Sequence, residues 1–158
     1  MRKAILFLVL VVLLFSLGCK AKQPSALRIG MSDDNPPFCS EVDGSLVGID
    51  SDIAHNIIRI LEIPYEISAM PQDQIEEKLL LGELDLGFVY IENKEDLNPD
   101  INYSIPYYEG TRDEEESEIY RYMLAMPKEA KMNDDIMAAL EDLIHNGDLL
   151  SILQTHIY

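Results

Sequence analysis

The nonpolar positions after residue 26 follow two alternating patterns, one typical of strands and one typical of helices. Short nonpolar runs at 27–31, 64–68 and 84–89 predict strands, and the last shows the weak alternation of a buried parallel strand. Between these runs, nonpolar residues recur with helical spacing, first over 53–61 and then over 75–79. The order strand–helix–strand–helix–strand predicts an α/β fold with a mostly parallel sheet and right-handed crossovers.

Capping residues mark the expected helix ends. Asp50 or Ser51 is expected to cap the first helix, because a short polar side chain at that position can accept a hydrogen bond from a free backbone N–H. Asn133 is expected to cap a later helix in the same way. Gly82 and Gly147 are expected just beyond helix ends, where the chain turns through a left-handed conformation. These signals divide the chain into short, alternating elements.

An acidic stretch at 109–119 interrupts the pattern. After it, residues 120–126 predict another strand, and two nonpolar stripes predict helices over 133–147 and 149–156. The acidic stretch itself is expected to be a solvated loop. The segments on both sides of it make a domain of about 130 residues, which is large enough for one hydrophobic core.

The N-terminus has the pattern of an export signal. Two basic residues precede a nonpolar run that is too short to span a bilayer comfortably. The run ends in Gly18 and Cys19, which resemble the processing site of bacterial lipoproteins, in which the cysteine is acylated. We therefore expect residues 1–18 to be a signal peptide, Cys19 to carry lipid, 19–26 to be a tether and 27–158 to be the folded lobe. A plain secretory signal, or an uncleaved anchor, is the alternative.

Charge and composition limit the partners. The chain has 12 Lys and Arg residues against 29 Asp and Glu residues, which gives a net charge of −17. Such a surface repels nucleic acid and anionic headgroups, so a nucleic-acid partner is not expected and cationic or neutral partners are favoured. Cys39 is a lone thiol if Cys19 carries lipid. The three histidines are scattered and are expected on helix surfaces; no Cys/His metal spacing and no Gly-rich phosphate loop occur, so no metal or cofactor is expected.

Several motifs together resemble a known family, the extracytoplasmic solute-binding proteins of polar amino-acid ABC transporters (family 3), which have the type II periplasmic-binding fold. The motifs are Pro36-Pro37-Phe38, Gly48-Ile49-Asp50-Ser51-Asp52-Ile53-Ala54, Leu81-Gly82-Glu83-Leu84-Asp85, Tyr103-Ser104-Ile105-Pro106-Tyr107-Tyr108, and the helical run over 140–152. The resemblance implies one lobe of that fold, with 109–119 in place of the second lobe. It also implies a location at the cell envelope and a membrane permease as partner.

The resemblance also indicates where a ligand would lie, because the family binds at the carboxyl ends of the strands. Asn35 and Gln72 stand where the family commonly has aromatic residues. Tyr90 and Glu92 stand where it has a glycine and a threonine, and Ser32 stands at a position that is often acidic. The candidate ligand-binding residues are Ser32, Asp33, Asp34, Asn35, Gln72, Tyr90 and Glu92.

One further position bears on the ligand's charge. Leu97 stands where the family places the arginine that clamps the carboxylate of an amino acid. Leucine cannot replace the two-pronged guanidinium bond, and Glu92 nearby would repel a carboxylate. We therefore expect free α-amino acids to bind weakly or not at all, and any small polar solute that binds to be cationic or neutral.

Three functions are compatible with these features. The first is a lipid-anchored solute-binding module for ABC-type uptake or sensing, divergent from standard amino-acid binders. The second is a docking lipoprotein that contacts an envelope protein, with self-association possible because an open nonpolar cleft face tends to find a partner. The third is an enzyme of the same fold, similar to a dehydratase. For the third, Asp50 and Asp52 are the only tempting acid pair, and helix capping explains them more simply, so the chain is not expected to be an enzyme.

Overall fold

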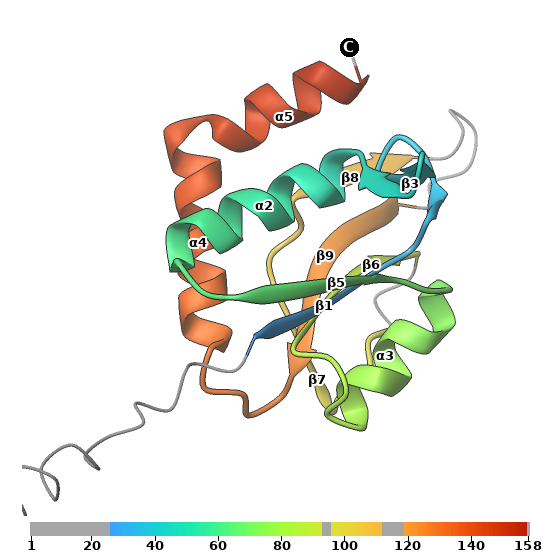
Figure 1. Ribbon diagram of the computed structural model, residues 1–158, viewed down its shortest axis with the longest axis vertical. Coiled ribbons are helices and arrows are strands. Elements are labelled where there is room, and N and C mark those ends of the chain that lie inside the picture. Colours follow the sequence, from blue (N-terminus) through green and yellow to red (C-terminus); the bar gives the residue numbers. More distant parts are fainter. Residues whose placement is uncertain (1–25, 93–95, 112–118, 158) are drawn as a thin grey trace, which may run out of the picture.

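A six-stranded sheet with the order β5-β1-β6-β9-β7, and with β8 paired to β9, organises the chain. The computed structural model describes residues 26–92, 96–111 and 119–157 (Figure 1). The strands are β1 (Leu27–Met31), β5 (Tyr65–Ala69), β6 (Leu86–Ile91), β7 (Ile101–Tyr103), β8 (Tyr108–Thr111) and β9 (Ile119–Pro127). β1 is parallel to β5 and β6, whereas β9 is antiparallel to β6, β7 and β8. The predicted α/β fold with a mostly parallel sheet is confirmed, and β9 is the strand that runs against the others.

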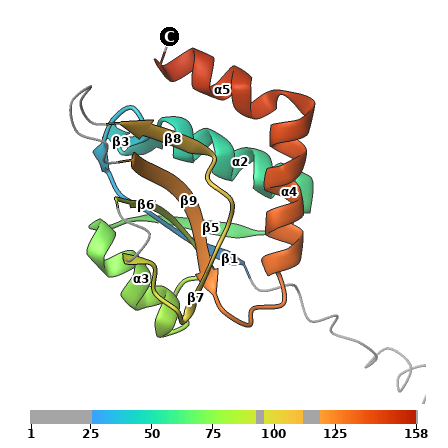
Figure 2. The ribbon, with the colours of Figure 1, turned by 180° about the vertical axis from the view of Figure 1, so that it is seen from behind.

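Helices cover both faces of this sheet. Figures 1 and 2 show α2 (Ile49–Leu61), α4 (Asn133–Asn146) and α5 (Asp148–Ile157) on one side and α3 (Gln72–Leu80) on the other. The alternation along β9 follows this division. Leu124 and Met126 pack into the core under α2 and α4, whereas Met123 and Ala125 pack into the core under α3. The nonpolar stripes read from the sequence therefore face the sheet, as amphipathic helices should.

A small antiparallel sheet lies between β1 and α2. It consists of β2 (Asp34–Asn35), β3 (Cys39–Val42) and β4 (Ser45–Val47), and it was not predicted from the sequence. Asp43 and Gly44 form the turn between β3 and β4, and both have positive φ, at 51° and 78°. Asp-Gly is the dipeptide that favours such a tight hairpin turn. This sheet brings Asn35 and Phe38 to the edge at which the parallel strands end.

The N-terminal end of α2 differs from the prediction. The helix begins at Ile49, with Gly48 at the N-cap position and no side-chain capping bond. The expectation that Asp50 or Ser51 caps the helix is wrong, because both lie inside it and have other partners. The Ser51 hydroxyl donates to the Leu46 carbonyl oxygen at 2.8 Å, and the Asp50 carboxylate accepts a hydrogen bond from another part of the chain. Asp50 and Ser51 therefore bond to groups outside the helix and do not cap it.

The other helix ends give mixed results. Asn133 is the first residue of α4 rather than its cap, which is Met132, and its side-chain amide donates to the Pro127 carbonyl oxygen at 2.7 Å. That bond holds the start of α4 against the end of β9, so the predicted cap is wrong. Gly147 and Gly82 do lie just beyond helix ends with φ of 87° and 69°, as predicted. Glycine adopts this left-handed backbone without steric cost.

The two ends of the acidic stretch lie in neighbouring strands. Glu109, Gly110 and Thr111 belong to β8, and Thr111 pairs with Ile119 of β9. The expectation of a loop over 109–119 is therefore wrong at both ends, because residues 109–111 and 119 form ladder bonds. The two ends lie side by side, as expected for one lobe. Residues 112–118, and the predicted signal peptide, Cys19 and most of the tether, lie outside the described residues.

Within the described ranges, no helix is both long enough and nonpolar enough to cross a membrane.

Candidate ligand-binding cleft

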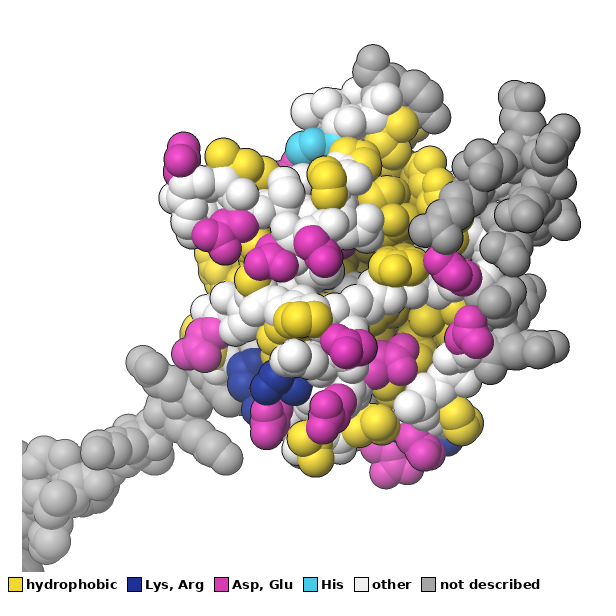
Figure 3. Space-filling view, turned by 90° about the vertical axis from the view of Figure 1, so that its right-hand side faces the viewer, with side chains coloured by type: hydrophobic (Ala, Val, Ile, Leu, Met, Phe, Trp, Pro, Cys, Tyr) yellow, Lys and Arg dark blue, Asp and Glu magenta, His cyan; other side chains and the backbone are white. Residues whose placement is uncertain are grey.

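A cleft of about 290 Å³ opens at the edge of the sheet where β1 and β6 end and β9 begins. Its described lining residues are Asn35, Pro36, Pro37, Phe38, Tyr90, Glu92, Tyr120 and Tyr122. Figure 3 shows the molecule from this side, with nonpolar side chains in a hollow and acidic side chains spread around it. Because β9 is antiparallel to β6, its first residues reach the same edge as the carboxyl end of β6. The cleft therefore lies where ligands bind in open α/β sheets.

Four of the described residues that line the cleft are aromatic: Phe38, Tyr90, Tyr120 and Tyr122, here called the aromatic floor. Phe38 and Tyr122 stack with ring centroids 3.4 Å apart and planes at 8°, and they are only 5% and 7% exposed. Tyr90 and Tyr120 lie 5.9 Å and 6.0 Å from Tyr122, and both are partly exposed. Such contacts add to the burial energy of each ring. The stacked pair is therefore a rigid base, and Tyr90 and Tyr120 are the rings that a ligand can reach.

Three of the residues predicted from the sequence line the cleft: Asn35, Tyr90 and Glu92. The Asn35 side-chain amide donates to the Tyr122 hydroxyl at 3.2 Å, so it holds a ring of the floor in place. Burial raises the pKa of Tyr122 to about 12, so its hydroxyl stays protonated well above neutral pH. Asn35 thus supports the cleft by a hydrogen bond to Tyr122, whereas an aromatic residue at this position would stack on a ligand.

The remaining predicted residues lie beside the cleft and do not line it. The Gln72 amide donates to the Tyr90 carbonyl oxygen at 2.8 Å, which fixes the backbone of β6 rather than facing a ligand. The buried Ser32 hydroxyl donates to the Asp34 carboxylate, and Asp34 lies in β2. Asp33 is exposed on the loop after β1. Leu97, at the position of the expected carboxylate clamp, packs against the core under α3.

The sequence reasoning missed Tyr120 and Tyr122 as site residues. Both come after the acidic stretch and were interpreted only as parts of a strand. Their separation of two residues places them on the same face of a strand, and that signal was present in the sequence. The pairing of β9 with β6 places Tyr122 opposite Tyr90, and its pairing with β8 places Tyr120 opposite Gly110. The segment that follows the acidic stretch thus contributes half of the aromatic floor.

The described lining of the cleft includes an acidic side chain. Glu92 is the charged residue among the described residues that line it, and none of them is Lys or Arg. The nearby Arg121 is engaged with Glu109, with 2.7 Å between guanidinium Nε and the carboxylate. A carboxylate ligand would therefore meet an acidic group and, in the described lining, no cation.

A buried carboxylate lies directly behind the aromatic floor. The Asp50 carboxylate accepts a hydrogen bond from the Tyr107 hydroxyl at 2.7 Å, and its backbone N–H donates to the Phe38 carbonyl oxygen at 2.9 Å. Burial raises the pKa of Asp50 to about 7, although the bond from Tyr107 acts in the opposite direction. Asp50 is therefore the group at this site whose charge changes near neutral pH.

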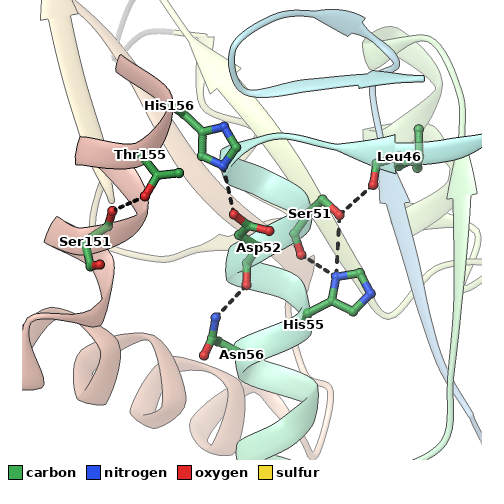
Figure 4. A network of polar contacts seen from close by, with 8 residues as sticks. All are labelled: Leu46, Ser51, Asp52, His55, Asn56, Ser151, Thr155 and His156. Atoms are coloured by element: carbon green, nitrogen blue, oxygen red, sulfur yellow. Dashed lines mark hydrogen bonds and ion pairs between the residues drawn. The ribbon is translucent and has the colours of Figure 1, made fainter. Parts of the chain in front are cut away.

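Asp50 and Asp52 do not form an acid pair. Asp50 is 5% exposed and bonds to Tyr107, whereas the side chain of Asp52 is 48% exposed and lies 2.8 Å from His156 Nε2 on α5 (Figure 4). His156 is thus partly buried between helices rather than a plain surface residue. The two carboxylates serve different contacts, so they do not meet a common substrate position.

The fold and the cleft together define the class of protein. An α/β lobe with a ligand-sized cleft at the carboxyl ends of its strands is one half of a type II periplasmic-binding fold. The chain belongs to the bacterial extracellular solute-binding proteins, family 3, whose model matches residues 27–157. Membership supports a role in solute binding at a periplasmic or envelope location, and the family is one of binding proteins rather than enzymes.

Solved structures agree on the fold. The arginine-, lysine-, histidine-binding protein ArtJ from Geobacillus stearothermophilus is 14% identical, with a TM-score of 0.72 over 84% of this chain and 95% of that one. The ligand-binding core of GluR0 with L-glutamate is 11% identical, with a TM-score of 0.70 over 85% and 99%. The arginine-bound form of domain 1 from TmArgBP is 26% identical, with a TM-score of 0.59 over 77% and 92%. No curated protein sequence matches this chain significantly.

Proposed function

We propose that the lobe binds a small cationic solute in the cleft, at the outer face of the membrane, for an ABC-type uptake or sensing system. The observation that carries the proposal is the lining itself, in which four aromatic rings and Glu92 occur together and none of the described lining residues is Lys or Arg. The face of an aromatic ring attracts a cation, and the attraction is strongest where water is excluded. A carboxylate beside the rings adds to this preference.

The same cleft is poorly suited to the carboxylate of a standard amino acid. Leu97 packs into the core under α3 rather than facing the cleft, and the guanidinium of Arg121 is already paired with Glu109. Because a carboxylate needs a donor fork or a cation when it leaves water, an α-amino acid would lose more than it gains. The protein is therefore a divergent member of its family, and it prefers cations that lack a carboxylate, with neutral polar solutes next.

A single lobe is a sufficient scaffold for such a ligand. Domain 1 of TmArgBP, taken alone, was solved in an arginine-bound form, and it is among the structures most similar in sequence to this chain. The cleft volume of about 290 Å³ is close to the lower end of the range for small-molecule sites, roughly 300–1,000 Å³. One lobe buries less of a ligand than two, so we expect modest affinity.

The test compares arginine with agmatine, which is arginine without its carboxylate. Calorimetry with the purified protein should show that agmatine binds more tightly than arginine, that spermidine also binds, and that glutamate does not. Thermal shift offers a second readout, because a ligand at a hundred times its dissociation constant adds about 2.7 kcal/mol of stability.

Matched variants locate the site. Glu92→Gln and Tyr120→Ala should each weaken agmatine binding, whereas Glu77→Gln, on the exposed side of α3, should leave it unchanged. Glutamate binding in the micromolar range, or arginine binding as tightly as agmatine, would contradict the proposed charge preference.

We also propose that Cys19 carries the lipid anchor. The support is the export signal and the Gly18-Cys19 pair, and these residues lie outside the described ranges. Mass spectrometry of the membrane fraction should find diacyl- or triacylglycerol on Cys19. Cys19→Ala should move the protein out of that fraction, and an unchanged, lipidated variant would exclude this site.

A docking role is the second candidate. Nonpolar side chains gather on the face in Figure 3, and Val42 and Val47 of the β3–β4 hairpin are 51% and 41% exposed. Exposed nonpolar surface of this kind favours a protein partner such as a permease. If none of the four probes binds, crosslinking of the anchored protein in membranes should recover a partner, and Val47→Asp should reduce the recovery.

A further inference from the structure

We infer that Asp50 sets the charge preference of the cleft from behind the aromatic floor, by giving up its proton when a cation binds on the other side. The inference rests on the proposed function, because it concerns the same cleft. It assigns a role to a residue that does not touch the ligand. It also makes binding dependent on pH.

The first support is position. Asp50 lies in the first turn of α2 and is 5% exposed. Its backbone N–H donates to the carbonyl oxygen of Phe38, which is a residue of the floor, and its carboxylate is bonded to Tyr107. The ring of Tyr107 lies 6.3 Å from that of Tyr122. A layer of aromatic rings therefore separates the carboxylate from the cleft.

The second support is the absence of a compensating cation. In the described part of the chain, burial and the hydrogen bond from Tyr107 are the influences that set the pKa of Asp50. An ionised carboxylate in such a place is costly, because water is excluded and the medium is weakly polarisable. The same medium lets a charge on the far side of the rings act strongly. A cation on the floor would thus stabilise the ionised form of Asp50.

The neighbouring groups do not titrate in the same range. Cys39 on β3, Tyr107 before β8 and Tyr122 on β9 face Asp50. Burial raises the pKa of Cys39 and of Tyr122 to about 12, and that of Tyr107 well above its ordinary value. All three stay neutral between pH 6 and pH 8. Asp50 is then the group of this buried set whose charge responds to a ligand.

Two histidines near the start of α2 need a control. His156 of α5 lies 2.8 Å from the Asp52 carboxylate, and His55 contacts the Ser51 carbonyl oxygen at 2.7 Å (Figure 4). Histidine side chains in general change charge near neutral pH. The described polar contacts of both histidines are with groups other than the Asp50 carboxylate, so neither histidine is expected to be coupled to the cleft.

Linkage fixes the sign and the size of the effect. A cation that favours ionised Asp50 lowers the pKa of that carboxyl, and by reciprocity ionised Asp50 tightens cation binding by the same factor. A shift of one unit in the pKa corresponds to about a tenfold change in affinity. Affinity for a cation should therefore rise as pH rises from 6 to 8, and binding at pH 7 should release part of a proton.

The experiment uses agmatine, whose two positive charges do not change between pH 6 and pH 8. Calorimetry of the full chain at both pH values should show about fivefold tighter binding at pH 8 than at pH 6, for a one-unit shift from a pKa of about 7. At pH 7, titrations in two buffers of different ionisation enthalpy should report proton release. Asp50→Asn should bind with no dependence on pH and no release, whereas His156→Gln should behave like the wild type.

Every other outcome of these titrations overturns the inference, the proposed function or both. Wild-type binding without proton release overturns this inference and leaves the proposed function intact; absence of binding at either pH overturns both. Release that survives in Asp50→Asn, or disappears in His156→Gln, also overturns it. If Asp50→Asn does not fold, Tyr107→Phe replaces it: loss of the hydrogen bond to the carboxylate should move the pH midpoint of binding upward, and an unmoved midpoint counts against the inference.

Discussion

Asp50 should make the folded protein less stable as pH rises. Its pKa increases from an ordinary value of 3.8 to about 7 in the folded state, chiefly because of burial. A carboxyl whose folded pKa is raised favours folding while it is protonated, and this contribution is lost as pH rises from its unfolded pKa through its folded pKa. Between pH 5 and pH 8 the loss of folding free energy amounts to about 3 kcal/mol. It accumulates at about 1.36 kcal/mol for each pH unit from pH 5 up to the folded pKa of about 7.

Urea denaturation of the wild type and of Asp50→Asn measures this loss. Asparagine keeps an oxygen that can accept the hydrogen bond from Tyr107, and it carries no charge at either pH. The free energy of unfolding of the variant, relative to the wild type, should rise by about 3 kcal/mol between pH 5 and pH 8. Asp135→Asn, an exposed change in the first turn of α4, should show no such rise. Parallel curves for the wild type and Asp50→Asn would refute the reasoning, whatever their offset.

Three further changes test the fold. In a chemical denaturation assay, Gly48→Ala should destabilise the protein by about 3 kcal/mol or more, because φ is 127° and the new Cβ would lie 2.3 Å from a backbone oxygen. Gly44→Ala is the control: φ is 78° there but the space around the residue is open, so the change should cost only about 1 kcal/mol. Asp85→Asn should cost about 1 kcal/mol of stability, because the partly exposed carboxylate accepts two side-chain hydrogen bonds from Arg28. Although burial acts to raise the pKa of Asp85, the Arg28 guanidinium lowers it, so the cost of the change should shrink as pH falls towards about 3. A cost that does not depend on pH would contradict this. Deletion of residues 113–116 should change the free energy of unfolding little, because the flanking strands already pair. A loss of several kcal/mol would assign that stretch to the core.

The periodic elements of the fold could be predicted, because their signal is local. β1, β5 and β6 and the helices follow from nonpolar spacing, which reports which face of an element is buried. The β3–β4 hairpin was missed although Asp43-Gly44 is a good turn signal, because its strands are short and largely exposed. The predicted caps failed for another reason: Asp50 and Asn133 bond to residues far away in the sequence, and local rules cannot include such partners.

The candidate site could be predicted only in part. The family resemblance located Asn35, Tyr90 and Glu92 at the cleft, since motif spacing fixes the loops at the strand ends. It could not place Gln72, whose side chain turns to the backbone of β6 instead of the cleft. Tyr120 was missed because its role depends on the pairing of β8 with β9 across the acidic stretch, and the register of two strands is not a local property.

The direct pairing of Thr111 with Ile119 has a consequence for signalling. Two-lobed binding proteins close around a hinge when they bind ligand, and a partner recognises the closed conformation. In the described residues the two strands that would form such a hinge are joined directly in one sheet. A bound solute would stay exposed on the cleft face. A partner would then recognise the solute and the rim of the cleft together as one composite surface, with the ligand itself as part of the contact.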